Sequence, residues 1–202
     1  MKRIYELGDK IRDYVNTKNL YDIYYKDNLD DWMKLCVSMD ILRDTCNALR
    51  YFEESGFGKD VGETYLKLYG FFQAIFLQQD AIRGLHSVIT KSEFKKDENS
   101  SWSNIRELRN IIVGHPIEKK TDKTTKRTVP VQAFMSNDEF MIASWDKVKM
   151  VEEFIQIKIK VTYEQYKIDA EKQLENIYDH QIKRWGEIMD TGNWVLHNHP
   201  QK

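Results

Sequence analysis

Arg109 and His115 are the two residues of this sequence whose types and spacing best suit phosphate binding and proton transfer. They lie in the stretch ELRNIIVGHP (residues 107–116), whose apolar residues recur with helical spacing. Wound as a helix, this region has one broad apolar arc, made of Trp102, Ile105, Leu108, Ile111, Ile112 and Val113. Arg109 and His115 fall inside that arc, one on each flank of Ile112. The face that should be buried therefore carries two groups that need polar partners.

The need for a partner is strongest for Arg109, because an unpaired buried charge is very costly. We expect the partner to be an acidic side chain, a second subunit or an anionic ligand. Gly114 suits a helix terminus, and Pro116 pushes His115 out of the α region. His115 then lies at the C-terminal end of the helix, where the dipole favours the imidazolium.

The spacing also bears on assembly. In an α-helix, the six steps along the chain from Arg109 to His115 give about 9 Å of rise and about 120° of rotation. One helix would aim both side chains at one small group with difficulty. A two-fold axis can bring Arg109 of one chain towards His115 of another. We therefore expect a homodimer with the helix at 104–115 near the interface.

The run Arg109-Asn110-Ile111-Ile112-Val113-Gly114-His115 resembles the motif of the HEPN superfamily, in its commonest form with asparagine after the arginine. The motif covers seven residues, and the helical pattern extends the resemblance over about 30–116. The resemblance implies a helical bundle that dimerises through the motif helices and, in active members, a metal-independent endoribonuclease. His115 would transfer a proton to or from the ribose 2′-hydroxyl or the leaving oxygen. Arg109 would hold the phosphate and stabilise its charge, and Asn110 would orient one of the two.

Many such proteins are toxins of toxin–antitoxin pairs or phage-defence effectors, so the resemblance implies single-stranded RNA as substrate and a possible antitoxin partner. The alternative is a non-catalytic module of the same fold that binds a nucleotide or a protein. In one subgroup a tyrosine two residues after the histidine is modified by a partner enzyme. Ile117 stands at that position here, which does not fit that form of regulation.

Two further groups are candidates for roles at the site. Gln79, Arg83 and His86 continue one helical arc, either as a polar wall beside Arg109 and His115 or as a helix end in solvent, with Asp80 pairing Arg83. A basic run follows the motif, and it could grip RNA phosphates as a flexible flap or be an ordinary solvated loop. Its cationic residues are Lys119, Lys120, Lys123, Lys126 and Arg127.

Long periodic stretches with few Gly and Pro residues predict a mainly α protein, read as one domain over 1–202. We expect an up-and-down helical bundle with one β-hairpin inserted after the fourth helix. The hairpin is expected at about 127–145, because β-branched and aromatic residues flank a Ser-Asn-Asp turn. One long C-terminal helix is expected at about 146–189.

Composition excludes several classes. The formal net charge of -1 argues against a chain coated with basic residues for non-specific nucleic-acid binding. Two histidines near the C-terminus, His197 and His199, make an incomplete metal site, so no metal or other cofactor is expected. The N-terminal residues lack the apolar core of a signal peptide, and no window approaches a membrane span. We therefore expect a cytoplasmic protein with no membrane partner.

Overall fold

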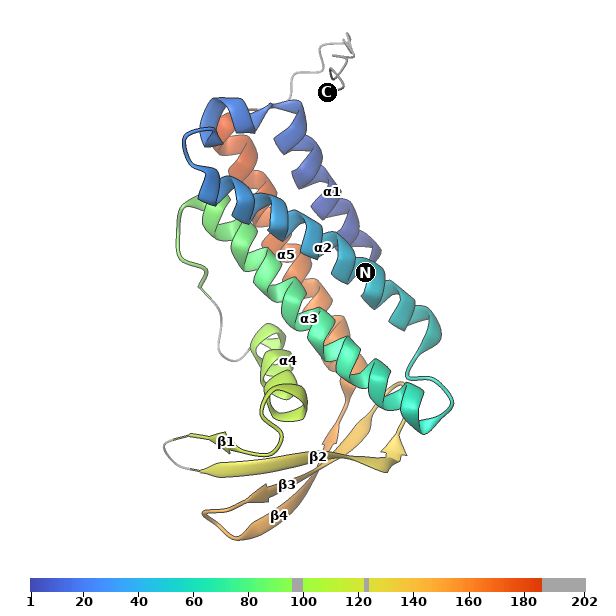
Figure 1. Ribbon diagram of the computed structural model, residues 1–202. Coiled ribbons are helices and arrows are strands. Elements are labelled where there is room, and N and C mark those ends of the chain that lie inside the picture. The colour runs from blue at the N-terminus through green and yellow to red at the C-terminus, as the bar shows by residue number, and fades with distance from the viewer. Residues whose placement is uncertain (96–99, 122–123, 187–202) are drawn as a thin grey trace, which may run out of the picture.

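The structure, a computed structural model, describes residues 1–95, 100–121 and 124–186. Most of them are helical, which confirms the mainly α prediction, and the long helices pack side by side (Figure 1). The helices are α1 (Lys2–Thr17), α2 (Leu29–Ser55), α3 (Val61–Thr90), α4 (Ser101–Arg109) and α5 (Ile159–Trp185). Two π-helical turns accompany them, η1 (Tyr21–Tyr25) and η2 (Asn110–Gly114).

The helix α3 is the most apolar of the five, and it packs against α2, α4 and α5. Leu68, Phe72, Ile82 and Leu85 are all buried along its length. A helix that is apolar nearly all round needs neighbours on several sides to leave water. Its central role therefore follows from its composition, and it supplies the surface on which α4 and the motif are positioned.

Side-chain caps fix where three of these helices begin. The side chain of Asn28 accepts from the backbone N–H of Asp31 (3.3 Å), and Asp60 accepts from that of Glu63 (2.9 Å). Ser100 caps α4 by accepting from the N–H of Ser103 (3.3 Å). Each cap satisfies a donor that the first helical turn leaves free. The helix that carries the motif thus begins at Ser101, three residues before the predicted start at 104.

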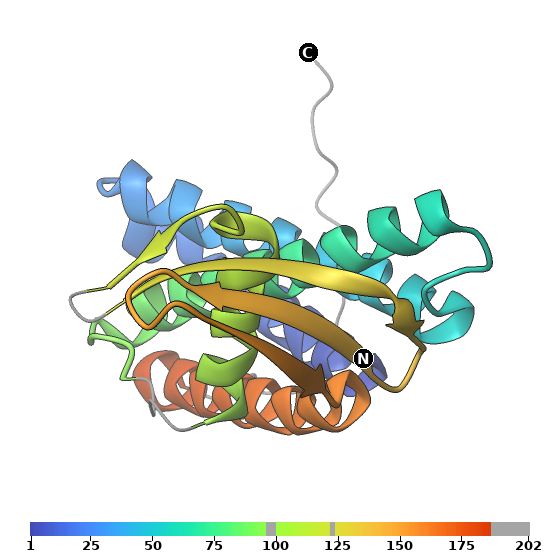
Figure 2. The same ribbon diagram turned by 90° about the horizontal axis from the view of Figure 1, so that it is seen from below.

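A four-stranded antiparallel sheet lies between α4 and α5 in the chain and crosses one end of the bundle (Figure 2). Its strand order is β1-β2-β3-β4, with each strand beside its neighbour in sequence. The strands are β1 (Lys119–Lys120), β2 (Thr125–Met135), β3 (Phe140–Asp146) and β4 (Val151–Ile157). Phe140, Ile142 and Ile157 join the hydrophobic cluster of the helices, so the sheet shares the core of the bundle.

The prediction of a single hairpin was wrong. The expected pair exists as β2 and β3, joined where the N–H of Ser136 donates to the carbonyl of Glu139 (2.9 Å). The residues expected to begin the C-terminal helix at 146 instead end β3, turn at Met150 (φ 56°) and form β4. Pairing with β3 overrides the helical spacing of this segment, as strand formation depends on neighbours more than on local preference.

Two boundaries follow from this correction. The helix α5 begins at Ile159, and its described part ends at Trp185, with Gly186 after it at φ 80°. The predicted end near 189 lies outside the described residues.

Over the described residues, none of the helices combines the length and apolar character needed to cross a membrane.

Candidate functional site

The helix α4 is held between α3 and α5 by buried rings and polar contacts. Trp102 and Ile105 are buried, and the backbone N–H of Trp102 donates to the Asp169 carboxylate of α5 (3.1 Å). On the other side, the Gln79 amide of α3 donates to the carbonyl of Trp102 (2.8 Å). Because Gln79 is fully buried, this bond also satisfies a polar group inside the protein. The start of the motif helix is therefore fixed at both flanks.

The motif itself does not follow α-helical geometry throughout. After Arg109 the helix widens into the π-helical turn η2, in which the N–H of His115 donates to the carbonyl of Asn110 (2.7 Å). Such wide turns are uncommon and often occur at functional sites. The rise and rotation between Arg109 and His115 are therefore not those of the α-helix that the sequence predicts.

The wide turn brings the Arg109 guanidinium against the backbone of Gly114. A Cβ atom at Gly114 would lie 2.7 Å from Nη1 of Arg109 and 3.7 Å from Oδ1 of Asn110. Glycine leaves room for the guanidinium in its present position, and its backbone is not left-handed. The residue before His115 is therefore in contact with the Arg109 side chain.

Neutral groups surround the half-buried Arg109 side chain. Its Nε and Nη2 donate to Oε1 of Gln73 on α3 (3.4 and 3.0 Å), and its Nη1 donates to Oδ1 of Asn110 (3.3 Å). The guanidinium also lies over the ring of Phe76, 4.0 Å from its centroid. No carboxylate among the described residues lies within ion-pair distance. Three of its five N–H donors are used, so two are free of described acceptors.

Arg106, one turn earlier, is paired quite differently. Its guanidinium also lies 4.0 Å from the centroid of the Phe76 ring, and Nη1 donates to Oε1 of Gln79 (3.2 Å). Its Nη2, however, lies 2.9 Å from a carboxylate oxygen of Asp80. Arg106 is thus neutralised by a carboxylate and Arg109 is not. The positive charge at the motif is available to an anion.

His115 is exposed, and its imidazole makes no hydrogen bond with any residue that the structure describes. The Asn110 side chain bonds to Arg109 and not to the His115 imidazole. Of these two residues, it therefore orients the arginine. The structure therefore brings Arg109, Asn110 and Gly114 together and leaves the His115 side chain without a described partner. An exposed imidazole of this kind can exchange protons with a bound molecule.

Sequence reasoning missed Gln73 and Phe76, which do most to hold Arg109. Both lie on the face of α3 that carries Gln79 and Asp80, at helical spacing from them. A glutamine on the most apolar helix of the chain was a signal that some donor must face it. Its partner could not be named without knowing how α4 crosses α3.

The proposed polar wall on α3 is only partly present. Gln79 contacts the motif helix through Arg106, as described above. Arg83 is exposed and lies 3.7 Å from Asp80, which is the pairing expected for a helix end in solvent. His86 lies farther along, edge-on to the ring of Phe94 at 5.3 Å, and burial lowers its pKa. These last two residues have no contact with the motif among the described residues.

The basic run is structured where it is described, and it does not form one free cationic patch. Lys119 lies in β1 opposite Lys126 of β2 and pairs with Glu107 of α4. Burial, with Lys126 nearby, lowers the pKa of Lys119. Lys120 lies 3.3 Å from Glu118, and Lys123 lies outside the described residues.

Arg127 is the exposed cation of this run that lines a groove. It makes no hydrogen bond or ion pair within the described part of the chain. The groove has a volume of about 500 Å³ and lies between the sheet, α3 and the segment after His115. Tyr69, Ile112 and Trp145 also line this groove, so an aromatic surface lies directly beyond the motif.

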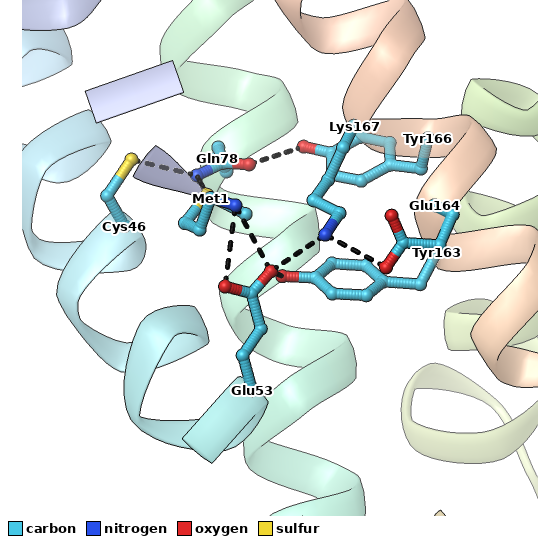
Figure 3. Close-up of polar contacts among 8 residues, drawn as sticks. All are labelled: Met1, Cys46, Glu53, Gln78, Tyr163, Glu164, Tyr166 and Lys167. Atoms are coloured by element: carbon cyan, nitrogen blue, oxygen red, sulfur yellow. Dashed lines mark hydrogen bonds and ion pairs between the residues drawn. The ribbon is translucent and has the colours of Figure 1, made fainter. Parts of the chain in front are cut away.

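A second polar cluster lies within the bundle, where α2, α3 and α5 meet (Figure 3). The buried Gln78 accepts from the Tyr166 hydroxyl (2.9 Å) and contacts the Cys46 sulfur (3.4 Å). Glu53 accepts from the Met1 amino group (3.1 Å), from Lys167 (3.0 Å) and from the Tyr163 hydroxyl (3.2 Å).

The groups of this cluster satisfy one another, which favours a structural role. Burial raises the pKa of the Cys46 thiol to about 12, so it stays protonated near neutral pH and is a poor nucleophile. Burial also raises the pKa of the Tyr163 hydroxyl far above its usual range. Neither group is suited to proton transfer near pH 7.

Among the described residues, no group of three or more His, Cys, Asp or Glu side chains could hold a metal ion. His197 and His199 lie outside them. Comparison of the chain with models of known protein families, with curated proteins and with solved structures finds no match.

Proposed function

We propose that this protein is a HEPN-type endoribonuclease that cuts single-stranded RNA without a metal ion, using Arg109 and His115. One observation carries the proposal: the Arg109 guanidinium has only neutral partners among the described residues, and two of its N–H groups are free. A cation held in place without a carboxylate is suited to bind a phosphate. The neighbouring arginine, already paired with Asp80, is not.

The chemistry follows from these positions. The ribose 2′-oxygen attacks phosphorus, and the bond from phosphorus to the 5′-oxygen breaks. This leaves a 2′,3′-cyclic phosphate on one product and a 5′-hydroxyl on the other. His115 transfers a proton to or from one of these two oxygens, and Arg109 stabilises the charge on the phosphoryl oxygens. Asn110 keeps the guanidinium oriented through its amide oxygen.

We propose further that two chains form a dimer and that the site lies at their interface. The exposed imidazole of His115 and the highly exposed Ile117 (79%) next to the motif support this assembly. The proposal extends to the biological setting, in which such a nuclease acts as a toxin or phage-defence effector and an antitoxin protein restrains it.

The test is cleavage of varied single-stranded RNAs by purified protein in the presence of EDTA, with analysis of the product ends. We expect 2′,3′-cyclic phosphate ends and cleavage that persists in EDTA. His115→Ala should lose about 10²–10⁴-fold in rate, the usual contribution of proton transfer. Arg109→Ala should lose about as much through the missing charge stabilisation.

Matched controls are available for both variants. His180→Ala removes another exposed histidine, on α5, and Arg83→Ala removes an exposed arginine that does not contact the motif. Both controls should keep parental activity. A parent protein that cleaves nothing in vitro, and whose expression arrests growth independently of Arg109 and His115, would leave the non-catalytic binding module as the better description.

A further inference from the structure

The groove beyond the motif is continuous with the site. Pro116, which directly follows His115, lines the groove, and its carbonyl accepts from the N–H of Thr128 on β2 (2.8 Å). This bond fixes the segment after His115 to the strand that carries Arg127. Substrate that reaches His115 therefore meets the sheet next.

One face of the sheet supplies the floor of the groove. The strand register places Arg127 of β2 opposite Trp145 of β3, and Trp145 opposite Glu152 of β4. All three line the groove. A cross-strand row thus presents a cation, a large ring and a carboxylate in that order. Tyr69 of α3, which is 41% exposed, lines the opposite wall.

These groups are available for binding. Trp145 is half-buried and has no ring partner among the described residues, and Arg127 has no charged partner among them. The groove volume of about 500 Å³ lies within the roughly 300–1,000 Å³ of small-molecule sites. Proteins that bind single-stranded nucleic acids use an aromatic ring beside a free cation, because bases stack on the ring and phosphates pair with the cation.

We infer that this groove binds one unpaired base of the RNA next to the cleaved phosphate, stacked on Trp145, and that Arg127 holds an adjoining phosphate. The inference rests on the proposed function. Glu152 gives the subsite a preference, since a carboxylate accepts hydrogen bonds from the exocyclic amino groups of A, C and G. Uracil has no exocyclic amino group and offers only its ring N3–H as a donor. The subsite therefore favours an amino-bearing base over uracil.

The experiment measures binding apart from cleavage. Short fluorescein-labelled 2′-O-methyl oligonucleotides of A, C or U lack the 2′-hydroxyl nucleophile and stay intact while anisotropy is recorded with the full chain. We expect A and C oligonucleotides to bind more tightly than U. Trp145→Ala should weaken binding of A and C by about 5- to 150-fold, the range expected for one stacked base.

Further variants separate stacking, charge and preference. Arg127→Ala should weaken binding of the A, C and U oligonucleotides equally. Glu152→Gln should reduce the difference in affinity between the A and U oligonucleotides, because the glutamine amide can also donate a hydrogen bond. The controls are Phe134→Ala, an exposed ring on β2 outside the groove, and Arg50→Ala on α2, and neither should alter binding. Trp145→Phe retains a ring, so it should bind the oligonucleotides more tightly than Trp145→Ala. Its tryptophan fluorescence should be quenched less than that of the parent when RNA is added.

The outcomes distinguish this inference from the proposed function. Equal binding by Trp145→Ala and Phe134→Ala overturns the inference even if the parent cleaves RNA. Trp145-dependent binding without any cleavage supports the inference and counts against the proposed function. If Trp145→Ala instead lowers the mass of the protein in solution and leaves RNA binding unchanged, the groove is a protein interface and the inference is wrong.

Discussion

Arg106 and Arg109 lie over the same Phe76 ring at the same 4.0 Å distance, but they differ in the charge of their other partners. Asp80 faces the first, and the Gln73 amide faces the second. An amide oxygen aligns a guanidinium without cancelling its charge. At the scale of single residues, the choice of Gln at 73 is what leaves the motif cationic.

Gln73→Glu tests this directly. The substitution keeps the shape of the side chain and places a carboxylate against Arg109. We expect thermal stability equal to or above that of the parent, because an ion pair replaces a neutral contact. RNA cleavage should fall by about 10- to 150-fold, since phosphate loses one charged hydrogen-bonding partner. Gln132→Glu, at an exposed position on β2, changes net charge equally and should leave the rate unaltered.

Gly114→Ala tests the contact between the turn and the arginine. The new Cβ would lie 2.7 Å from Nη1 of Arg109, so the guanidinium must move, which a flexible side chain does at little cost to the fold. We expect unchanged stability and a loss of up to about 100-fold in cleavage, as misplacement of a catalytic group by about 1 Å can cause.

The control for this substitution is Gly70→Ala on α3, where a Cβ would meet no atom within 4 Å. It should raise the free energy of unfolding by about 0.5–1 kcal/mol and leave cleavage as it was. If Gly114→Ala cleaves at the parental rate, the close packing of Arg109 on the turn has no part in function.

At the scale of elements, the sequence predicted the features that hydrophobic periodicity and turn residues decide. The long helices, the β2–β3 turn and the end of the motif helix near Gly114 were all visible in this way. The segment at 151–157 was not, because β4 is an edge strand exposed at every position but Ile157 and shows no clean alternation. Its conformation depends on pairing with β3, which local sequence cannot express.

The π-helical turn was hidden for a similar reason. The residue types at 110–114 do not show whether the backbone hydrogen bonds there are α-helical or π-helical. In the structure, the wide turn occurs together with the contact of Arg109 with Gln73, which lies on another helix. The identities of Arg109, Asn110 and His115 could therefore be read from the sequence, whereas the way they are held could not. The same applies to Trp145, which joins the groove only through the sheet register.

The Glu53 carboxylate of α2 pairs with Lys167 of α5, and this pairing makes stability depend on pH. Burial raises the pKa of Glu53, but hydrogen bonds from Lys167 and the Met1 amino group outweigh it, so the pKa is lowered from 4.5. A lowered pKa in the folded state stabilises the protein above the unfolded pKa. That contribution is lost as pH falls through the folded value.

We expect Glu53→Gln to reduce the free energy of unfolding at pH 7 by about 1–3 kcal/mol, because the Met1 amino group loses its carboxylate and Lys167 keeps only Glu164 as a charged partner. The difference from the parent should shrink as pH falls below 4.5. Urea unfolding of both proteins over this range measures it. Glu54→Gln, at the exposed next position on α2, should differ little from the parent at any pH. A Glu53→Gln difference that stays constant with pH would show that shape, not charge, matters there.

At the scale of the whole molecule, α4 and the sheet lie at one end of the bundle (Figure 1), and the motif and the groove belong to these elements. The polar cluster of Glu53 and Gln78 lies among the long helices (Figure 3). Large apolar side chains remain exposed around the groove, among them Ile117 (79%), Val129 (58%) and Phe154 (60%). A gathering of such residues marks a binding surface more often than chance exposure does. This end of the molecule thus has exposed apolar surface on which the proposed RNA and second chain would bind.

The proposed dimer makes a quantitative prediction about mixed subunits. If Arg109 of one chain acts with His115 of the other, a heterodimer of Arg109→Ala and His115→Ala has one intact site and one site lacking both residues. Random exchange of equal amounts makes about half of the dimers heterodimers, so the mixture should regain about a quarter of parental activity. Each variant alone should stay inactive.

Light scattering at micromolar concentration should give the mass of two chains for the parent and for both variants. A restored fraction near zero, with exchange verified by differently labelled subunits, would place both residues of each site in one chain, as the contact of Arg109 with Gly114 allows. A monomeric mass for an active parent would remove the dimer from the mechanism altogether.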